Sequence, residues 1–193
     1  LDEPGGTRHH ELSRYLAAQG NQVTIIASPV SYLTGDSKIH ETRPDLFDGG
    51  GRVTVLRVYT YTALHRSFIH RVFSFLSFMV SSFIKGLEVK HIDLVWGTYP
   101  PIFQGLSDWL LARMNRDPFL FEVRDLWPSF AVQVGVLRQP LLIRLSEWLE
   151  TFLYRHADTV LVNSPGFIPH IESRGASQVV LVPNGTDPRM FEP

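Results

Sequence analysis

The sequence contains no cysteine, no excess of charge of one sign and no uninterrupted apolar run long enough to span a bilayer. Without cysteine there is no disulfide framework and no thiolate metal site, which fits a reducing compartment. Lysine and arginine number 18 against 19 acidic residues, so there is no basic field of the kind that binds nucleic acid. The eight histidines show no spacing typical of a zinc site, and we expect no metal. The first residues lack the basic and apolar regions of a signal peptide, so we expect a cytoplasmic protein.

The 193 residues, 44% of them hydrophobic, suffice for one α/β domain or two small ones. Short apolar runs alternate with segments of helical periodicity. Strands are expected at residues 23–27, 52–59, 93–98, 119–125, 159–164 and 179–185. Helices are expected at residues 8–20, 66–87, 101–115, 140–157 and 165–174. Residues 28–52 are rich in Gly, Pro, Ser and Asp and are expected to form a long loop that is functional or mobile.

This alternation predicts βαβ units and an α/β, Rossmann-like parallel sheet with helices on both faces, in a single domain over residues 1–193. Ligands bind to such sheets outside the carboxyl ends of the strands. The residues at or just after the expected strand ends are Ser28, Pro29, Tyr59, Thr60, Thr98, Tyr99, Pro100, Arg124, Asp125, Trp127, Asn163, Ser164, Asn184 and Gly185. We take this edge as the predicted binding site.

Gly5 and Gly6 precede an expected helix for which Thr7 is a plausible N-cap. Glycines allow a backbone to approach a phosphate, and a helix N-terminus attracts the anion. The alternative is a plain turn, because neither a G-x-G-x-x-G fingerprint nor a Walker lysine is present. Ser164 at a strand end could pass for a nucleophile, but a Ser before Pro165 is more simply a helix N-cap.

The segment from Arg124 to Trp127 combines three side chains suited to ligands. The planar fork of Arg124 suits a phosphate or a carboxylate. Asp125 can accept hydrogen bonds from sugar hydroxyls or act as a base, and Trp127 offers a flat face for stacking. The residues alone do not separate this binding role from a structural closure of the loop.

The expected helix over residues 66–87 is rich in phenylalanine. One of its faces is apolar and is expected to face a membrane, with Arg66, Arg71, Lys85 and Lys90 meeting anionic headgroups. The residues of this face are Phe68, Val72, Phe75, Leu76, Met79 and Phe83. The alternative is a helix that covers the core of the domain.

Several stretches of the sequence carry a resemblance to a known family. The more specific ones are "EVRDLWP" at residues 122–128 and "VPNGTD" at residues 182–187. The others are "PGGTRHHELSRYLAAQGNQVTIIAS", "GTYPPIFQGLSDWLLARMNRDPFLFEVRDLWP" and "ADTVLVNSPGF". Together these stretches resemble the N-terminal half of group 1 (family 4) glycosyltransferases, closest to the bacterial O-antigen and capsule branch that includes N-acetylfucosamine transferases.

The resemblance implies one half of a GT-B enzyme that retains anomeric configuration and needs neither a metal nor another cofactor. The N-terminal domain would hold the acceptor, typically a polyprenyl-diphosphate-linked saccharide, at the inner membrane face. The second domain would hold the nucleotide-sugar, linked to UDP or GDP. The family's first strand and its second domain are expected to be missing from these residues, so the chain alone is expected to be inactive.

Carried over by position, Gly5, Gly6, Thr7 and Arg8 belong to the loop that approaches the donor diphosphate. Asn184 matches the hinge region. The resemblance also places Arg124 and Asp125 where many members have His-Asp, as the catalytic pair. Because arginine does not shuttle a proton at neutral pH, Asp125 is the better candidate for contacting the acceptor hydroxyl.

Tyr99, Trp127 and Ser164 complete the predicted substrate-binding residues at this edge. Two other classes of protein compete with the transferase. One is a noncatalytic membrane-surface or protein-interaction module on the same scaffold. The other is a nucleotide-dependent oxidoreductase domain, which lacks its glycine fingerprint here.

Overall fold

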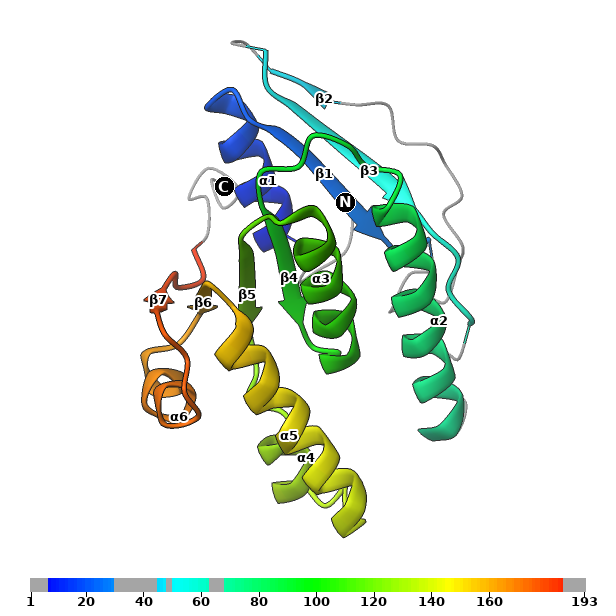
Figure 1. Ribbon diagram of the computed structural model, residues 1–193, viewed down its shortest axis with the longest axis vertical. Coiled ribbons are helices and arrows are strands. Elements are labelled where there is room, and N and C mark those ends of the chain that lie inside the picture. Colours follow the sequence, from blue (N-terminus) through cyan, green and yellow to red (C-terminus); the bar gives the residue numbers. More distant parts are fainter. Residues whose placement is uncertain (1–6, 30–44, 48–49, 63–67, 186–193) are drawn as a thin grey trace, which may run out of the picture. The chain divides into compact units, whose positions relative to one another are not determined.

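The computed structural model describes residues 7–29, 45–47, 50–62 and 68–185 (Figure 1). Its strands pair into two separate sheets. The chain divides into two compact units, which we call the first unit (residues 1–86 and 184–193) and the second unit (residues 87–183). The single domain over residues 1–193 stays a prediction.

The first unit contains a three-stranded sheet in the order β1-β3-β2. Its elements are α1 (Thr7–Ala18), β1 (Gln22–Ala27), β2 (Asp45–Leu46), β3 (Arg52–Arg57) and α2 (Phe68–Gly86). β1 runs parallel to β3, whereas β2 is antiparallel to it. Helix α1 ends at Ala18, two residues before the expected end, and Gly20 just beyond it adopts a φ of 90° that favours glycine.

The second unit contains a fully parallel sheet in the order β4-β5-β6-β7. Its strands are β4 (Val95–Tyr99), β5 (Phe119–Val123), β6 (Thr159–Val162) and β7 (Val179–Leu181). Its helices are α3 (Ile102–Asn115), α4 (Ser129–Gln133), α5 (Pro140–His156), the 3-10 turn η1 (Pro165–Phe167) and α6 (Ile168–Ser173). Helices α3 and α5 pack against each other and against the sheet (Figure 1). This arrangement confirms the predicted α/β fold with a parallel sheet flanked by helices.

The core of the second unit lies between its sheet and helices α3 and α5. Phe119, Phe121 and Val123 alternate along β5 and are almost completely buried. Gly105 of α3 lets the helix come close, because a Cβ there would lie 2.7 Å from Phe121 Cε2 and 2.8 Å from Leu153 Cδ1. The glycine therefore sets how near α3 lies to the strand and to α5.

Two carboxyl groups are also buried in this unit. Asp108 of α3 lies against Gly97 of β4, and Gln104 Nε2 donates a 2.9 Å hydrogen bond to its Oδ1. Burial raises the pKa of Asp108 from its ordinary 3.8 to about 7, more than the hydrogen bonds from Gln104 and Ser107 lower it. The group is therefore a buried acid that holds its proton well above the usual range.

Glu150 of α5 is the second buried carboxyl group and is fully inaccessible. The Tyr154 hydroxyl donates a 2.9 Å hydrogen bond to its Oε1, and His170 Nε2 lies 3.1 Å from the same oxygen. Arg174 Nε lies 2.9 Å from the other oxygen, Oε2. Since His170 and Arg174 belong to α6 and its C-cap, this cluster ties α6 to α5.

Three local features differ from the sequence expectations. The expected loop over residues 28–52 includes β2, which the sequence signal missed because two residues are too short for a periodic pattern. Strand β3 ends at Arg57 and not at residue 59. Helix α4 was not predicted, because five residues after Pro128 leave no room for helical periodicity to show.

Candidate functional site

The candidate site lies at the carboxyl end of the parallel sheet in the second unit. Arg124 and Asp125 follow directly after the last residue of β5, with Arg124 half-buried and Asp125 exposed. Neither side chain forms an ion pair with a described residue. The strand-end rule therefore placed both residues correctly at this edge of the sheet. Their two side chains do not form an ion pair with each other.

The loop that carries the two charges is fixed by backbone hydrogen bonds. Arg124 N–H donates to the Tyr99 carbonyl at 3.2 Å, which joins the ends of β5 and β4. Trp127 N–H donates to the Asp125 carbonyl at 3.1 Å and closes a tight turn around the carboxylate. Asp125 is thus held by the ends of two neighbouring strands.

Tyr99 was predicted to bind substrate at this edge, but its side chain lies in the core of the second unit. Its side chain is 1% exposed, and its hydroxyl donates a hydrogen bond to the Trp127 carbonyl. Burial raises the pKa of Tyr99 above its ordinary value, and the neighbouring Tyr154 and Glu150 raise it further to a smaller extent. The hydroxyl therefore keeps its proton and can donate a hydrogen bond. In this structure Tyr99 supports the loop from the core and presents no surface to a substrate.

Trp127 is half-buried and packs against the core of the second unit. The following Pro128 is almost completely buried. Part of the indole therefore serves to hold the loop, and only the remainder is available for stacking. Its substrate-binding role stays a prediction.

Asn163 joins the third strand to this edge. It follows β6, and its Nδ2 donates a 3.3 Å hydrogen bond to the Arg124 carbonyl. Its Oδ1 and the Thr98 Oγ1 are buried and have no hydrogen-bond partner in the described part of the chain. The strand-end rule marked both residues, but it could not assign Asn163 its role of bridging to Arg124.

Ser164 occupies the N-cap position of η1 with Pro165 after it, as the sequence predicts. Its side chain makes no capping hydrogen bond, so the expected capping interaction is absent although the position is correct. The half-buried hydroxyl at the end of β6 stays a predicted substrate contact.

In the first unit, two predicted site residues that are distant in sequence lie together. Arg8 Nη1 donates a 3.3 Å hydrogen bond to Asn184 Oδ1, which joins the first turn of α1 to the residue after Pro183. Gly5, Gly6 and the side chain of Thr7 lie outside the described residues. The diphosphate-binding loop therefore stays a prediction.

Helix α2 exposes a different apolar stripe from the one predicted to face a membrane. Val72, Leu76, Met79 and Phe83 are half-buried, Phe75 is 38% exposed, and the side chain of Phe68 lies outside the described residues. The most exposed apolar residues of the helix are Phe73, Val80 and Ile84.

Two serines of α2 form hydrogen bonds with the segment that follows β3. Ser77 Oγ accepts a 2.8 Å hydrogen bond from Tyr61 N–H, and Ser81 Oγ donates to the Tyr59 carbonyl. These contacts turn the helix about its axis relative to the predicted orientation.

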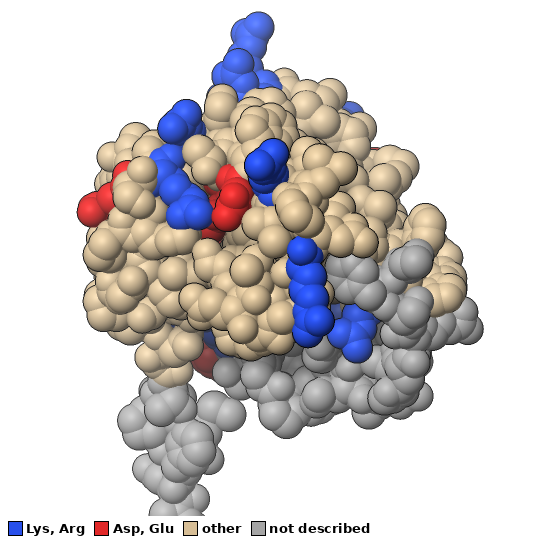
Figure 2. All heavy atoms as spheres, turned by 90° about the horizontal axis from the view of Figure 1, so that it is seen from below, with Lys and Arg blue, Asp and Glu red and all other residues tan. Residues whose placement is uncertain are grey.

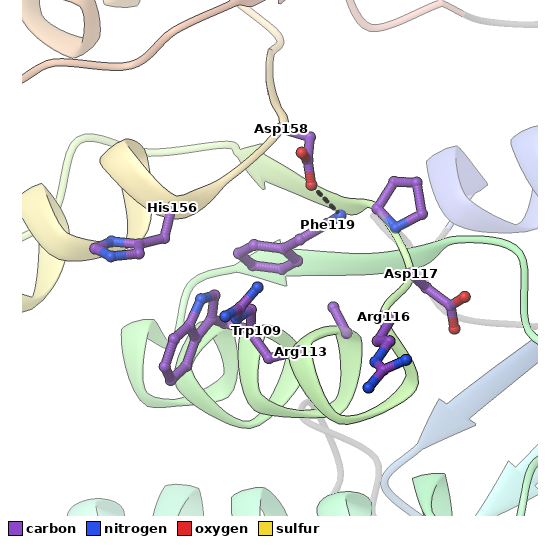
Figure 3. Close-up of a pocket in the computed structure, with 9 residues that line it drawn as sticks. Trp109, Arg113, Arg116, Asp117, Phe119, His156 and Asp158 are labelled. Atoms are coloured by element: carbon purple, nitrogen blue, oxygen red, sulfur yellow. Dashed lines mark hydrogen bonds between the residues drawn. The ribbon is translucent and has the colours of Figure 1, made fainter.

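A hollow of about 630 Å³ lies at the opposite edge of the sheet, where β5 begins (Figure 3). Its labelled lining residues are Trp109, Arg113, Arg116, Asp117, Phe119, His156 and Asp158. Asp158 Oδ2 already accepts a 2.7 Å hydrogen bond from Phe119 N–H. Helices α3 and α5 both end here, so their dipoles disfavour an anion. We therefore place the candidate site at the carboxyl edge and not in this hollow.

The described residues contain no group of three or more metal-ligating side chains that could hold a metal ion. No helix in the described ranges is long and apolar enough to cross a membrane.

The parallel sheet, its flanking helices and a polar carboxyl edge define a Rossmann-like domain of the kind that forms half of a GT-B fold. The solved sucrose-phosphate synthase from Thermosynechococcus elongatus is similar, with a TM-score of 0.67 and 19% identity over 99% of this chain. A second solved chain of the same enzyme matches 96% of this chain and 88% of its own length, with a TM-score of 0.59 and 17% identity. This chain spans 45% of the first of these structures.

Residues 5–185 match the protein family described as the glycosyl transferase 4-like domain. Since the match covers most of the 193 residues, the chain belongs to this family. A comparison with curated proteins finds no match. This match confirms that the chain is a group 1 glycosyltransferase domain, as "EVRDLWP" and "VPNGTD" led us to expect.

Proposed function

We propose that this chain is the acceptor-binding half of a retaining glycosyltransferase that moves a sugar from a nucleotide-sugar to a saccharide acceptor. The observation that carries the proposal is the exposed Asp125 carboxylate, held at the carboxyl end of β5 in a member of the glycosyl transferase 4-like family. We propose the finer assignment to O-antigen or capsule synthesis, with a polyprenyl-diphosphate-linked acceptor, on the sequence resemblance alone.

In this proposal Asp125 accepts a hydrogen bond from the attacking hydroxyl of the acceptor and orients it. The carboxylate is suited to this role because it is exposed and has no ion-pair partner among the described residues. Arg124 binds a phosphate or carboxylate group of a substrate through its planar, charged guanidinium group. The part of Trp127 that is not packed in the core stacks on a sugar ring.

The donor is a nucleotide-sugar, linked to UDP or GDP. We place a donor contact at the start of α1, near Arg8 and Asn184, because the dipole at a helix N-terminus attracts a diphosphate. The resemblance assigns most of the donor contacts to a second domain. We therefore also propose that these 193 residues alone do not transfer sugar, and that the protein works in the cytoplasm at the inner membrane face.

The test uses the full-length protein with UDP- and GDP-linked sugars and polyprenyl-diphosphate-linked saccharides. We expect Asp125→Asn to lower kcat/KM for the acceptor by about 100-fold or more, because the acceptor hydroxyl loses its charged acceptor group. Asp93→Asn is the matched control, since Asp93 is also exposed and precedes β4 in the same unit. Wild-type rates in Asp125→Asn would refute the role of this carboxylate.

A second variant separates binding from chemistry. Arg124→Ala is expected to raise KM for the phosphate-bearing substrate by about tenfold or more, because a charge-assisted bidentate contact is lost. An unchanged KM would contradict the phosphate role of Arg124. Failure of the full-length wild-type protein to transfer any sugar would favour the noncatalytic module.

A further inference from the structure

The hollow where β5 begins is lined by polar side chains from several separate segments of the second unit. Trp109 and Arg113 belong to α3, His156 is the last residue of α5, and Asp158 lies in the loop before β6 (Figure 3). The volume of about 630 Å³ lies within the range of roughly 300 to 1,000 Å³ that is typical of small-molecule sites. The hollow can therefore hold a ligand of the size of a disaccharide.

The hydrogen-bond donors of the hollow have capacity to spare. Trp109 Nε1 is buried and has no hydrogen-bond partner among the described residues. The guanidinium groups of Arg113 and Arg116 are exposed and pair with no side chain in the described part of the chain. Arg116 has a φ of 65° at the C-cap of α3, a position where glycine is the usual residue. An arginine at this position costs backbone energy, and no contact of its guanidinium group with a described residue offsets that cost.

The hydrogen-bond acceptors of the hollow also have capacity to spare. Asp158 Oδ2 accepts the hydrogen bond from Phe119 N–H, but its Oδ1 has no partner in the described ranges. Asp117 Oδ2 is buried and has no hydrogen-bond partner there either. His156 Nδ1 donates a 2.7 Å hydrogen bond to the Phe152 carbonyl, since a carbonyl can only accept. This bond fixes the orientation of the ring at the rim of the hollow.

The charges of the hollow favour a neutral ligand. Arg113 and Arg116 are balanced by two carboxylates, those of Asp117 and Asp158. The face where α4 and the start of α5 lie, by contrast, shows separate basic side chains and few acidic ones (Figure 2). An anion in the hollow would meet the carboxylates and the C-terminal ends of α3 and α5, whereas a cation would meet the two guanidinium groups.

A ligand that uses both the donors and the acceptors must itself accept and donate hydrogen bonds. A hydroxyl group does both, so a neutral ligand with several hydroxyl groups fits the hollow. A sugar ring also has apolar C–H groups, which suit the indole of Trp109. The chemistry of the hollow therefore selects a saccharide.

We propose that this hollow is a noncatalytic binding site for a neutral saccharide. Arg113 donates hydrogen bonds to the hydroxyl oxygens of the sugar, and Asp158 Oδ1 accepts a hydrogen bond from a hydroxyl group. Strand β5 runs from Phe119 at the hollow to Val123, directly before Asp125 and its neighbour at the candidate site. Five residues of strand span roughly 15 to 20 Å, so a saccharide in the hollow is held away from the reacting groups. The binding stands or falls independently of the proposed sugar transfer.

The test follows the indole N–H signals of the full-length protein by NMR while neutral saccharides are added. The probes are glucose, galactose, N-acetylglucosamine and disaccharides of these sugars, with sodium phosphate as the anionic probe. Trp109→Phe and Trp127→Phe assign the signal that reports on the hollow and the signal that reports on the carboxyl edge. At least one saccharide is expected to shift the Trp109 signal saturably, and sodium phosphate is expected to leave this signal in place.

Two variants test the groups that contact the sugar. Arg113→Lys keeps a positive charge at the end of α3 but loses the planar fork, so it is expected to weaken saccharide binding by about fivefold or more. Asp158→Asn keeps an oxygen that can accept from Phe119 N–H, while an amide NH₂ replaces the acceptor Oδ1. It is expected to weaken binding by a similar factor. Arg144→Lys is the matched control, because Arg144 is an exposed arginine of α5 that does not line the hollow.

Circular dichroism and urea unfolding verify that the variants are folded. Equal saccharide affinity of wild type, Arg113→Lys and Asp158→Asn overturns the proposal, as does a Trp109 signal that no saccharide shifts. A larger shift with sodium phosphate than with any saccharide also overturns it, because that result assigns the hollow to anions. Saccharides that shift only the Trp127 signal overturn it as well and assign saccharide binding to the carboxyl edge. A wild type that transfers no sugar but shows the saturable Trp109 shift supports this proposal while it contradicts the proposed function.

Discussion

Replacing Arg174 with methionine is expected to destabilise the second unit by about 3 to 5 kcal/mol. The reason lies in the Glu150 carboxylate, which is fully buried. Its Oε1 is contacted by the Tyr154 hydroxyl and by His170, but Oε2 is approached only by Arg174 Nε within the described part of the chain. Methionine keeps the apolar stem of Arg174 and its helix propensity while removing the charge. One buried carboxylate oxygen is then left without a partner.

The size of the expected stability loss depends on which positive charges face Glu150. Arg174 supplies the compensating charge, because arginine stays protonated in proteins. Removing one partner of a buried ion pair costs far more than the pair itself contributes. Exposed pairs, by contrast, contribute about 0 to 1 kcal/mol. The large expected loss therefore follows from the burial of Glu150 and not from the mere presence of a salt bridge.

Urea unfolding followed by tryptophan fluorescence measures the loss of stability in the second unit. All four tryptophans lie within residues 87–183, so the signal reports on the second unit. Arg144→Met is the control, because Arg144 is exposed on the same helix as Glu150. Glu150→Met combined with Arg174→Met should recover a large part of the stability, since no unpaired charge then remains. A loss below about 1 kcal/mol for Arg174→Met would refute the reasoning.

Three further predictions concern the same unit. Burial raises the pKa of Asp108 to about 7, so the folded state keeps a proton that the unfolded state releases. The free energy of unfolding should therefore fall by up to about 4 kcal/mol as pH rises from about 4 to above 7, and Asp108→Asn should flatten this slope in urea titrations. Gly105→Ala should cost about 1 to 3 kcal/mol, because its Cβ would meet Phe121, and a neutral result in the same assay would contradict the close packing of α3. Tyr99→Phe should cost about 1 kcal/mol by removing the donor to the Trp127 carbonyl, and an unchanged midpoint would show that this hydrogen bond is not needed.

The alternation of strands and helices could be predicted because each element carries a local signal. The strands of the second unit are short apolar runs, and helix α5 begins with Pro140 at its first turn as expected. The carboxyl-edge rule then placed Arg124 and Asp125 at the end of β5 from topology alone. Both results rest on patterns that a single stretch of sequence contains.

The exposed face of α2 could not be predicted in the same way. Almost all sides of this helix carry apolar side chains, so periodicity does not say which of them faces water. The decision comes from hydrogen bonds between Ser77 and Ser81 of the helix and Tyr59 and Tyr61 of another segment. Such contacts between separate segments leave no trace in local periodicity. The burial of Glu150 could not be predicted for the same reason, because its partners His170 and Arg174 come from another part of the chain.

Tyr99 illustrates the limit of the strand-end rule. Side chains alternate along β4, and Gly97 lies against Asp108 of α3. Two residues further, Tyr99 therefore points to the same covered face and enters the core, although it is the last residue of the strand. The rule selects the correct edge, but the alternation decides which residues at that edge reach a ligand.

The buried side chains of this edge have a functional consequence for Asp125. Arg124 donates one hydrogen bond through its N–H to the carbonyl of Tyr99, at the end of β4, and its carbonyl accepts one from Asn163, which follows β6. The Tyr99 hydroxyl then holds the carbonyl of Trp127, two residues beyond the carboxylate. Three adjacent strands thus restrain the loop on both sides of Asp125. Such a frame suits the role that we propose for Asp125, which is to meet a sugar hydroxyl at hydrogen-bond distance, because rigid strand ends position a side chain better than a long loop does.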